Sequence, residues 1–301
     1  LIGSAGIRMN ANALRADLGY NPLNLPVDIV NIRTRGVTGS LGLVAKLPQK
    51  WRLAVSYASG FRTPNVDDIG KIFDSGDGIV RVPNANLNPE RTHNLDVSIF
   101  KSFWNDRVQL ELTGYYIWLQ DMLRISNTTF NGQDSLFFDE QLSQVQHNSN
   151  IGLGVIYGAF ASIRAELSHN ILLFSSLSWT KGEDRTEGVS NRNLDHIPPA
   201  FGQTSLQFKL KQMRHELFVN YQYWKFWDEY SDSSVDRPQF AVPDKGMPAW
   251  MTFNYRLSYN LHPMLTLQVA VENILDTHYR VFATGLNAPG RNFIVSLRGK
   301  F

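Results

Sequence analysis

The chain has 301 residues, of which 19% are charged and 12% aromatic, with a formal net charge of +2. This near-balanced charge gives no electrostatic reason to expect a nucleic-acid partner, and the lack of cysteine excludes disulfides and thiol catalysis. No run of about 20 apolar residues is present, so the sequence predicts no transmembrane helix, although a membrane β-strand escapes this test because only every second residue is apolar.

Apolar and polar residues alternate along twelve segments, which predicts twelve β-strands. In chain order these are residues 1–11, 36–47, 51–59, 93–101, 107–118, 155–167, 170–180, 202–210, 214–224, 250–260, 264–273 and 291–301. In segments such as 107–118, 214–224, 250–260 and 264–273, charged side chains keep to one face. That pattern fits a strand between lipid and water, and it fits equally a soluble sandwich with one buried face.

The lengths of the connections separate these two interpretations. Tight connections at residues 48–50, 102–106, 168–169, 211–213 and 261–263 alternate with long ones at 12–35, 60–92, 119–154, 181–201, 225–249 and 274–290. An up-and-down meander gives this alternation when all tight turns lie at one rim, as in outer-membrane barrels. Greek-key sandwiches mix their connection lengths. The sequence therefore predicts an all-β, antiparallel, up-and-down transmembrane β-barrel wall of about 12 strands.

Aromatic residues gather near both expected rims. Those near the tight turns are Trp51, Phe103, Trp104 and Tyr259, and those near the long loops are Tyr116, Trp118, Trp179, Tyr223 and Trp250. Aromatic rings favour the interface between membrane and water, which supports the membrane interpretation.

Five short motifs, in a fixed order, resemble those of the TonB-dependent outer-membrane receptors. Residues 56–65 resemble "SYxxGFRAPN" through Phe61, Arg62 and Pro64, and residues 83–90 resemble "NPxLxPE" through Asn86, Leu87 and Pro89. Residues 115–122 resemble "FYxxLxDMI", residues 273–279 resemble "NLFDxxY" through Asn273 and Tyr279, and Pro289, Gly290 and Arg291 match "xPGR". The resemblance covers residues 36–301.

The motif residues also have plain structural roles. Pro64 cannot donate to a strand ladder and so ends pairing, while Asn273 can hydrogen-bond its own turn. Pro289 and Gly290 supply a tight bend. Each motif alone is therefore also consistent with residues whose only role is to position the loops.

The resemblance implies a twenty-two-stranded barrel with an N-terminal plug, of which residues 1–301 are the C-terminal barrel portion. No plug and no TonB-contacting segment are expected within these residues. The implied function is active import across the Gram-negative outer membrane of a scarce nutrient, foremost a ferric siderophore or other iron complex, with no enzyme chemistry and no cofactor. Implied partners are the TonB complex through the plug, outer-membrane lipid, the nutrient chelate, and the barrel assembly machinery, which would read Phe301 at a periplasmic C-terminus.

Candidate ligand contacts lie in the long loops. Trp224, Trp227 and Tyr230 stand among acidic residues in and beside loop 225–249, where exposed aromatics favour a ligand surface or pack loop against loop. His278 is a further loop-side candidate. The seven histidines show no ligand spacing, so no metal site is predicted.

Several alternatives remain open at this point. A haem or cobalamin receptor of the same family is one, although residues 65–83 lack the histidine expected for haem. A twelve-stranded outer-membrane hydrolase would need a catalytic triad at one rim, for which His93 is the one candidate. A passive porin would lack the motif series.

Overall fold

The computed structural model describes residues 1–17, 29–70, 73–74, 78–138, 141–190, 192–231, 236 and 241–300. Twelve wall strands follow one another in chain order and pair with their neighbours in antiparallel fashion. They are β1 (Ile2–Asp17), β2 (Ile29–Leu47), β3 (Trp51–Arg62), β6 (Glu90–Phe103), β7 (Val108–Asn127), β9 (Gln141–Ser168), β10 (Ile171–Asp184), β11 (Phe201–Leu210), β12 (Met213–Gln222), β13 (Trp250–His262), β14 (Leu265–Glu272) and β15 (Asn292–Gly299).

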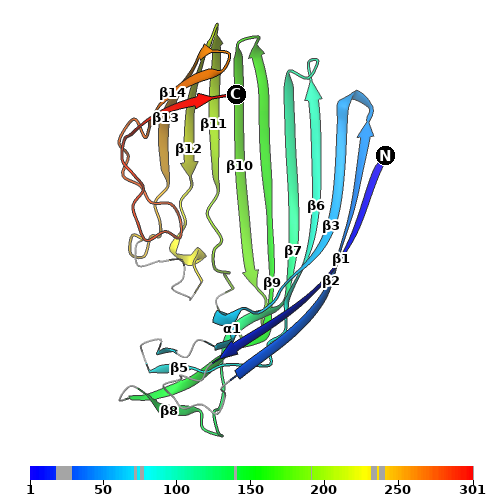
Figure 1. Cartoon of the computed structure of the whole chain (residues 1–301), viewed down its shortest axis with the longest axis vertical. Coiled ribbons are helices and arrows are strands. Elements are labelled where there is room, and N and C mark those ends of the chain that lie inside the picture. Colours follow the sequence, from blue (N-terminus) through cyan, green and yellow to red (C-terminus); the bar gives the residue numbers. More distant parts are fainter. Residues whose placement is uncertain are drawn as a thin grey trace.

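The wall is a curved, open sheet (Figure 1). Its strand order ends at β1 and β15, each of which pairs with one neighbour in the described part of the chain. The up-and-down order confirms the predicted meander of twelve wall strands, and the open sheet has the form of a partial barrel. No helix in the described ranges is long and apolar enough to cross a membrane.

All five tight turns lie at one end of the wall, at the top of Figure 1. The first is the 3-10 helix η1 (Pro48–Lys50), and several turn residues adopt a left-handed backbone, including Lys50 at φ 63° and Asp106 at φ 69°. Lys50 Nζ lies 2.7 Å from Asp106 Oδ2, which joins two neighbouring turns. Hydrogen bonds from Lys50 and Ser102 lower the pKa of the Asp106 carboxyl.

The apolar face of the wall is exposed over many strands. Leu53, Ile99 and Leu112 are cross-strand neighbours on this face, and Leu112 is 51% exposed. On the β15 edge, Val295 is 72% exposed. Leucine, isoleucine and valine in such a continuous row indicate a surface that meets lipid and not water.

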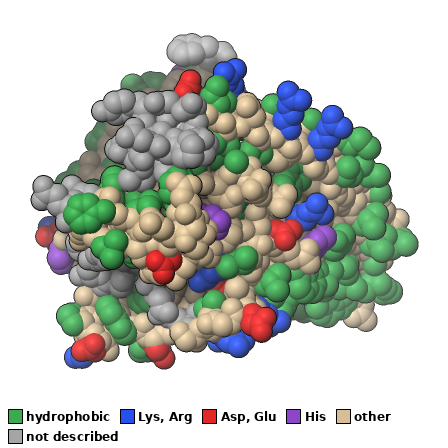
Figure 2. Space-filling view, turned by 90° about the horizontal axis from the view of Figure 1, so that it is seen from below, with side chains coloured by type: hydrophobic (Ala, Val, Ile, Leu, Met, Phe, Trp, Pro, Cys, Tyr) green, Lys and Arg blue, Asp and Glu red, His purple; other side chains and the backbone are tan. Residues whose placement is uncertain are grey.

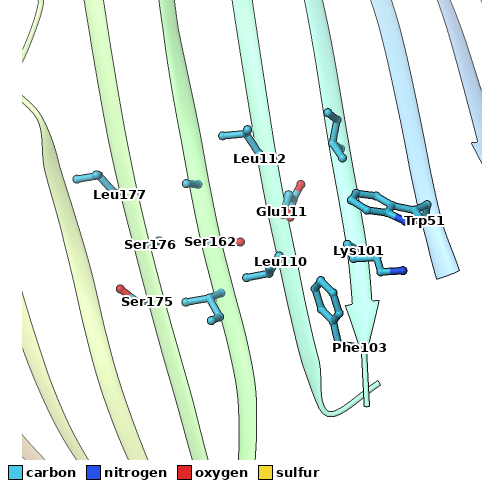
Figure 3. A pocket seen from close by; sticks show the side chains of 13 residues that line it. Trp51, Lys101, Phe103, Leu110, Glu111, Leu112, Ser162, Ser175, Ser176 and Leu177 are labelled. Carbon is cyan, nitrogen blue, oxygen red and sulfur yellow. The ribbon is translucent and has the colours of Figure 1, made fainter. Parts of the chain in front are cut away.

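Aromatic side chains border this face as expected. Tyr157 lies 5.9 Å, between ring centroids, from both Tyr116 and Trp179 toward the long-loop end. Trp51 and Phe103 lie at the tight-turn end (Figure 3). The two groups mark the upper and lower limits of the apolar band.

The opposite face is polar and internally bonded. Ser98 and Thr113 share a hydrogen bond of 2.9 Å between neighbouring strands, and Arg256 pairs with Glu216 at 3.0 Å. Burial of the apolar band in lipid and hydration of this polar face account for the two-residue period.

The structure corrects the expected length of several loops. β1 runs to Asp17, β2 begins at Ile29, and β7 and β9 continue into the segment 119–154 that was predicted to be a loop. Short elements cover these extensions: β5 (Ile79–Arg81) pairs in parallel with β9, β8 (Ser135–Phe138) pairs antiparallel with it, β4 (Phe73–Asp74) pairs with β5, and α1 (Val66–Gly70) lies nearby. Val80 and Val145 are fully buried there. Beyond the membrane band, folded loops and not lipid cover the strands, so the simple alternation fades.

Candidate functional site at the long-loop end

The long-loop end carries the motif residues and the predicted ligand contacts. Seen from this end, charged and histidine side chains are spread among polar atoms, and hydrophobic side chains gather along one flank (Figure 2). Three clusters organise the described part of this end, centred on Arg62, Asn273 and Lys225.

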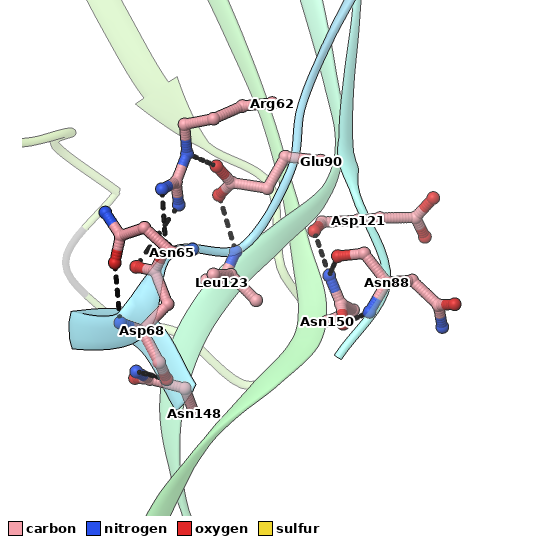
Figure 4. Close-up of polar contacts among 9 residues, drawn as sticks. All are labelled: Arg62, Asn65, Asp68, Asn88, Glu90, Asp121, Leu123, Asn148 and Asn150. Atoms are coloured by element: carbon pink, nitrogen blue, oxygen red, sulfur yellow. Dashed lines mark hydrogen bonds and ion pairs between the residues drawn. The ribbon is translucent and has the colours of Figure 1, made fainter. Parts of the chain in front are cut away.

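Arg62 ties the first two motifs together (Figure 4). Its guanidinium forms ion pairs with Glu90 and, at 2.7 Å, with Asp68 Oδ2. Asp68 also accepts from the Asn65 backbone N–H at 2.9 Å, and Asn65 Oδ1 accepts from the Asp68 N–H at 2.9 Å, which closes a reciprocal cap at the start of α1. Glu90 Oε1 accepts from the Leu123 N–H at 2.7 Å, so the cluster reaches β7.

Asparagine side chains fasten the segment 83–90 to β9 (Figure 4). Asn150 Oδ1 accepts from the Asn88 N–H, and Asn150 Nδ2 donates to the Asn88 carbonyl, both at 2.8 Å. Asn86 donates its backbone N–H to Asn84 Oδ1 at 2.9 Å, and Leu87 is buried. Pro89 precedes β6 directly. The motif residues therefore hold a re-entrant loop against the wall.

Phe61 and Pro64 contribute by packing. A Cβ placed on Gly36 of β2 would lie 2.2 Å from Phe61 Cε1, so this glycine provides the space for the ring. Pro64 is buried just after β3 ends.

Asn273 joins the last two motifs. It is buried, its N–H donates to Asn254 Oδ1 at 2.8 Å, and its Oδ1 accepts from the Thr277 N–H at 2.8 Å. Asn273 Nδ2 donates to the Thr277 carbonyl at 2.8 Å and to the Pro289 carbonyl at 3.3 Å. Arg291 Nε donates to the Ile274 carbonyl at 2.8 Å. The structure thus brings into contact motif residues that lie up to 17 positions apart in the sequence.

Tyr279 secures the start of β13. Its ring lies 4.4 Å from that of Trp250 between centroids, and its carbonyl accepts from the Ala288 N–H at 2.9 Å. Burial raises the pKa of the Tyr279 phenol. Tyr279 therefore packs the last long loop against β13 of the wall.

Lys225 and Tyr230 form the buried base of loop 225–249. Lys225 Nζ donates to the Ile197 carbonyl at 2.9 Å and lies 5.7 Å from the Tyr230 ring centroid. Tyr230 packs with Met247 and Phe282 in a small core. Burial lowers the pKa of Lys225 and raises that of Tyr230 to about 12. Tyr230 is therefore enclosed in this structure and not displayed to solvent.

Trp224 and Trp227 line an open cavity of about 580 Å³. The other lining residues are Phe226, Asp228, Asp244 and Lys245. Trp224 Nε1 donates to the Lys245 carbonyl at 2.7 Å. Phe226 is 57% exposed. Sequence reasoning missed Lys245 and Asp244, although the Pro-Asp-Lys-Gly run at 243–246 is a recognisable turn signal that places them at a loop tip.

His278 lies apart from this cavity. Its Nε2 forms a hydrogen bond of 2.8 Å with Asn287 Nδ2. His93, the rim candidate for a hydrolase, bonds through Nδ1 to the Tyr57 hydroxyl at 2.6 Å. Across the residues that the structure describes, no group of three or more His, Cys, Asp or Glu side chains is placed to hold a metal ion.

Solved structures of a transporter and of receptors have the same fold. The copper transporter OprC superposes with a TM-score of 0.76 at 16% identity, over 99% of this chain and 45% of that one. A mutant of the ferric enterobactin receptor PfeA from Pseudomonas aeruginosa, in complex with enterobactin, gives 0.69 at 15% identity over 98% and 46%. The ferric-catecholate import receptor Fiu of E. coli K12 gives 0.65 at 12% identity over 99% and 42%. The chain thus spans less than half the length of these proteins.

No curated protein sequence matches the chain. A comparison with models of protein families supports the same assignment as the solved structures. The family model described as "TonB dependent receptor-like, beta-barrel" matches residues 2–274, which is most of the chain. That match, the open meander of twelve wall strands and the motif contacts agree: the chain belongs to the TonB-dependent receptor β-barrel family.

Proposed function

We propose that this chain is the C-terminal barrel portion of an outer-membrane, TonB-dependent importer of a ferric siderophore or another iron complex. The plug and the remaining wall strands would come from a preceding part of a longer receptor, in keeping with the 45% share of OprC that the chain spans. TonB would act through that plug. The barrel would carry no enzyme activity, and the family match favours it over a hydrolase or a porin.

In this proposal the long-loop end faces the cell exterior and the tight turns and the C-terminus face the periplasm. Phe301 lies outside the described residues, and its role as an assembly signal read by the barrel assembly machinery remains part of the proposal.

One observation carries the choice of substrate. The open cavity combines three aromatic side chains with three charged ones, namely Trp224, Phe226, Trp227, Asp228, Asp244 and the exposed Lys245. Aromatic faces stack on flat aromatic ligand groups, so the three aromatic rings support the choice of substrate. Ferric catecholates are rich in aromatic rings, and PfeA and Fiu are named for ferric enterobactin and ferric catecholates.

The test is ligand binding to the full receptor, purified in detergent. Tryptophan fluorescence would be titrated with ferric enterobactin, a ferric hydroxamate, haem, cobalamin and a copper chelate. We expect tightest binding to the ferric catecholate. Trp227→Ala should weaken it by about 0.5–1.5 kcal/mol through the lost stacking alone, in addition to the lost buried area.

Trp104→Ala is the matched control, because Trp104 is 77% exposed at the opposite, tight-turn end. It should leave affinity unchanged, and His278→Ala should have a smaller effect than Trp227→Ala. Preference for the copper chelate, or an equal loss in Trp104→Ala and Trp227→Ala, would refute the proposed substrate. Uptake that persists without TonB would refute the proposed mechanism.

A further inference from the structure

The apolar face of the wall contains a groove of about 620 Å³ close to the tight turns (Figure 3). Its sides are formed by Ile99, Leu110, Leu112 and Leu177. Ala161 of β9 lies between Leu112 and Leu177 in the strand register, and its single methyl group leaves the space open. The groove is open, and these side chains make its sides apolar.

A cation stands at the tight-turn end of this groove. Lys101 is the cross-strand neighbour of Trp51 on one side and Leu110 on the other, so it belongs to the apolar face. Its Nζ lies 4.8 Å from the Trp51 ring centroid and 5.2 Å from that of Phe103. Figure 3 shows these three side chains together where β6 approaches its turn.

The ammonium of Lys101 has one hydrogen-bond acceptor and no ion-pair partner among the described residues. It donates to the Gln49 carbonyl, and within the described ranges no carboxylate lies within the 4.0 Å of an ion pair. Lysine has three donors, and its long stem lets the head reach the interface while the methylenes stay in the apolar layer. An anion supplied from outside the chain would complete this site.

We propose that the groove binds one phospholipid of the leaflet at the tight-turn end, with an acyl chain along Ala161 and the phosphodiester at Lys101 Nζ. That this leaflet is the periplasmic one rests on the proposed function. Trp51 and Phe103 then flank the headgroup, the position that aromatic rings favour in a membrane. The site is distinct from the loop cavity, since it lies on the outer face near the opposite rim.

The experiment is native mass spectrometry of the full receptor, delipidated in detergent and titrated with dioleoyl phosphatidylglycerol. The wild type should retain one lipid more tightly than the rest. Lys101→Ala should weaken that first binding step about fivefold, the equivalent of about 1 kcal/mol for one lysine near an anionic lipid surface. Lys101→Arg should keep it, because the charge is kept.

Lys46→Ala is the matched control, because Lys46 is paired with Arg52 in the register on the polar face near the same rim. It should leave lipid binding unchanged. Ala161→Trp should fill the groove and remove the first binding step, whereas Ala5→Trp, on the same face of β1 opposite Leu41, should not. Equal occupancy in the wild type and Lys101→Ala, or an equal loss in Lys46→Ala, would overturn the inference.

The same variants, tested in addition for uptake in cells, separate this inference from the proposed function. Lipid binding needs a folded wall only. A receptor that fails to take up any iron chelate but holds the lipid would overturn the proposed function alone. Full uptake with no specific lipid would overturn the lipid site alone.

Discussion

The Asp276 side chain occupies the space beside the Gly290 backbone. A Cβ placed on Gly290 would lie 2.5 Å from Asp276 Oδ1, and this oxygen accepts the hydrogen bond of the Arg291 N–H at 2.7 Å. Gly290 does not have a left-handed backbone, so the requirement for glycine comes from this close approach. The contact locks the last long connection onto the start of β15.

Gly290→Ala should therefore destabilise the barrel by about 1–3 kcal/mol, because the added methyl displaces Asp276 from the Arg291 N–H. The measurement is urea unfolding of the full receptor in lipid, followed by tryptophan fluorescence. Gly114→Ala is the control, since its Cβ would meet its nearest atom, the Gly158 carbonyl oxygen, at 4.0 Å. Equal losses for the two would show that the Asp276 contact is unimportant.

Glu90 should matter more than Arg62 for the fold of the first motif loop. Glu90→Ala removes the acceptor of the Leu123 N–H, and an unsatisfied donor costs about 1–3 kcal/mol. The Arg62 side chain is 48% exposed, so Arg62→Ala should cost about 1 kcal/mol or less. Hydrogen exchange of the Leu123 amide should quicken most in Glu90→Ala and less in Glu90→Gln, which keeps an oxygen acceptor. Faster exchange in Arg62→Ala than in Glu90→Ala would contradict this order.

Adjacent residues on one strand should differ sharply in their tolerance of charge. Val97 lies on the apolar face in register with Val55, while Ser98 bonds Thr113 on the polar face. Val97→Arg should destabilise the barrel by about 2–4 kcal/mol, and Ser98→Arg by less. Unfolding in lipid vesicles checks this, and the reverse order would mean that the two faces have been exchanged.

The loop core around Tyr230 should weaken at high pH. Its folded-state pKa of about 12 lies above the ordinary value of 10.0, so the stability it contributes is complete below pH 10 and is lost as pH rises toward 12. Absorbance at about 295 nm should show a phenol titrating near pH 12 that is missing in Tyr230→Phe. Phe282→Ala should open the core and move that titration toward pH 10. A wild type without the late step would rule out the buried phenol.

The wall was predictable from the sequence because the two faces of each strand meet different solvents, and the residues alternate accordingly. Leu110 and Leu112 meet lipid, while Gln109 and Glu111 do not, and no tertiary information is needed to see the period. The extension of β9 toward Gln141 was not predictable in this way. Ser143 and Val145 lie on the same face of β9 and are both fully buried, so the buried face there contains a polar residue as well as an apolar one.

The site was predictable in part. The motifs identified Asn273 and Pro289 separately, but their hydrogen bond depends on how the final loop folds back. Tyr230 resembled an exposed loop aromatic because its enclosing partner, Phe282, comes from a different loop. Trp224 and Trp227 do line one cavity, and ligand binding there remains a prediction.

The tight turns have a consequence for how such a receptor can diversify. Turns such as the one at Lys211, with φ 53°, leave no slack between the strands they join. One inserted residue there would slip the register and send every following side chain of the strand to the opposite face. At the other end, an added residue can be absorbed by a loop. Changes in chain length are thus tolerated at the long-loop rim and not at the tight-turn rim, so the loops can vary while the position of the apolar band along the wall stays constant.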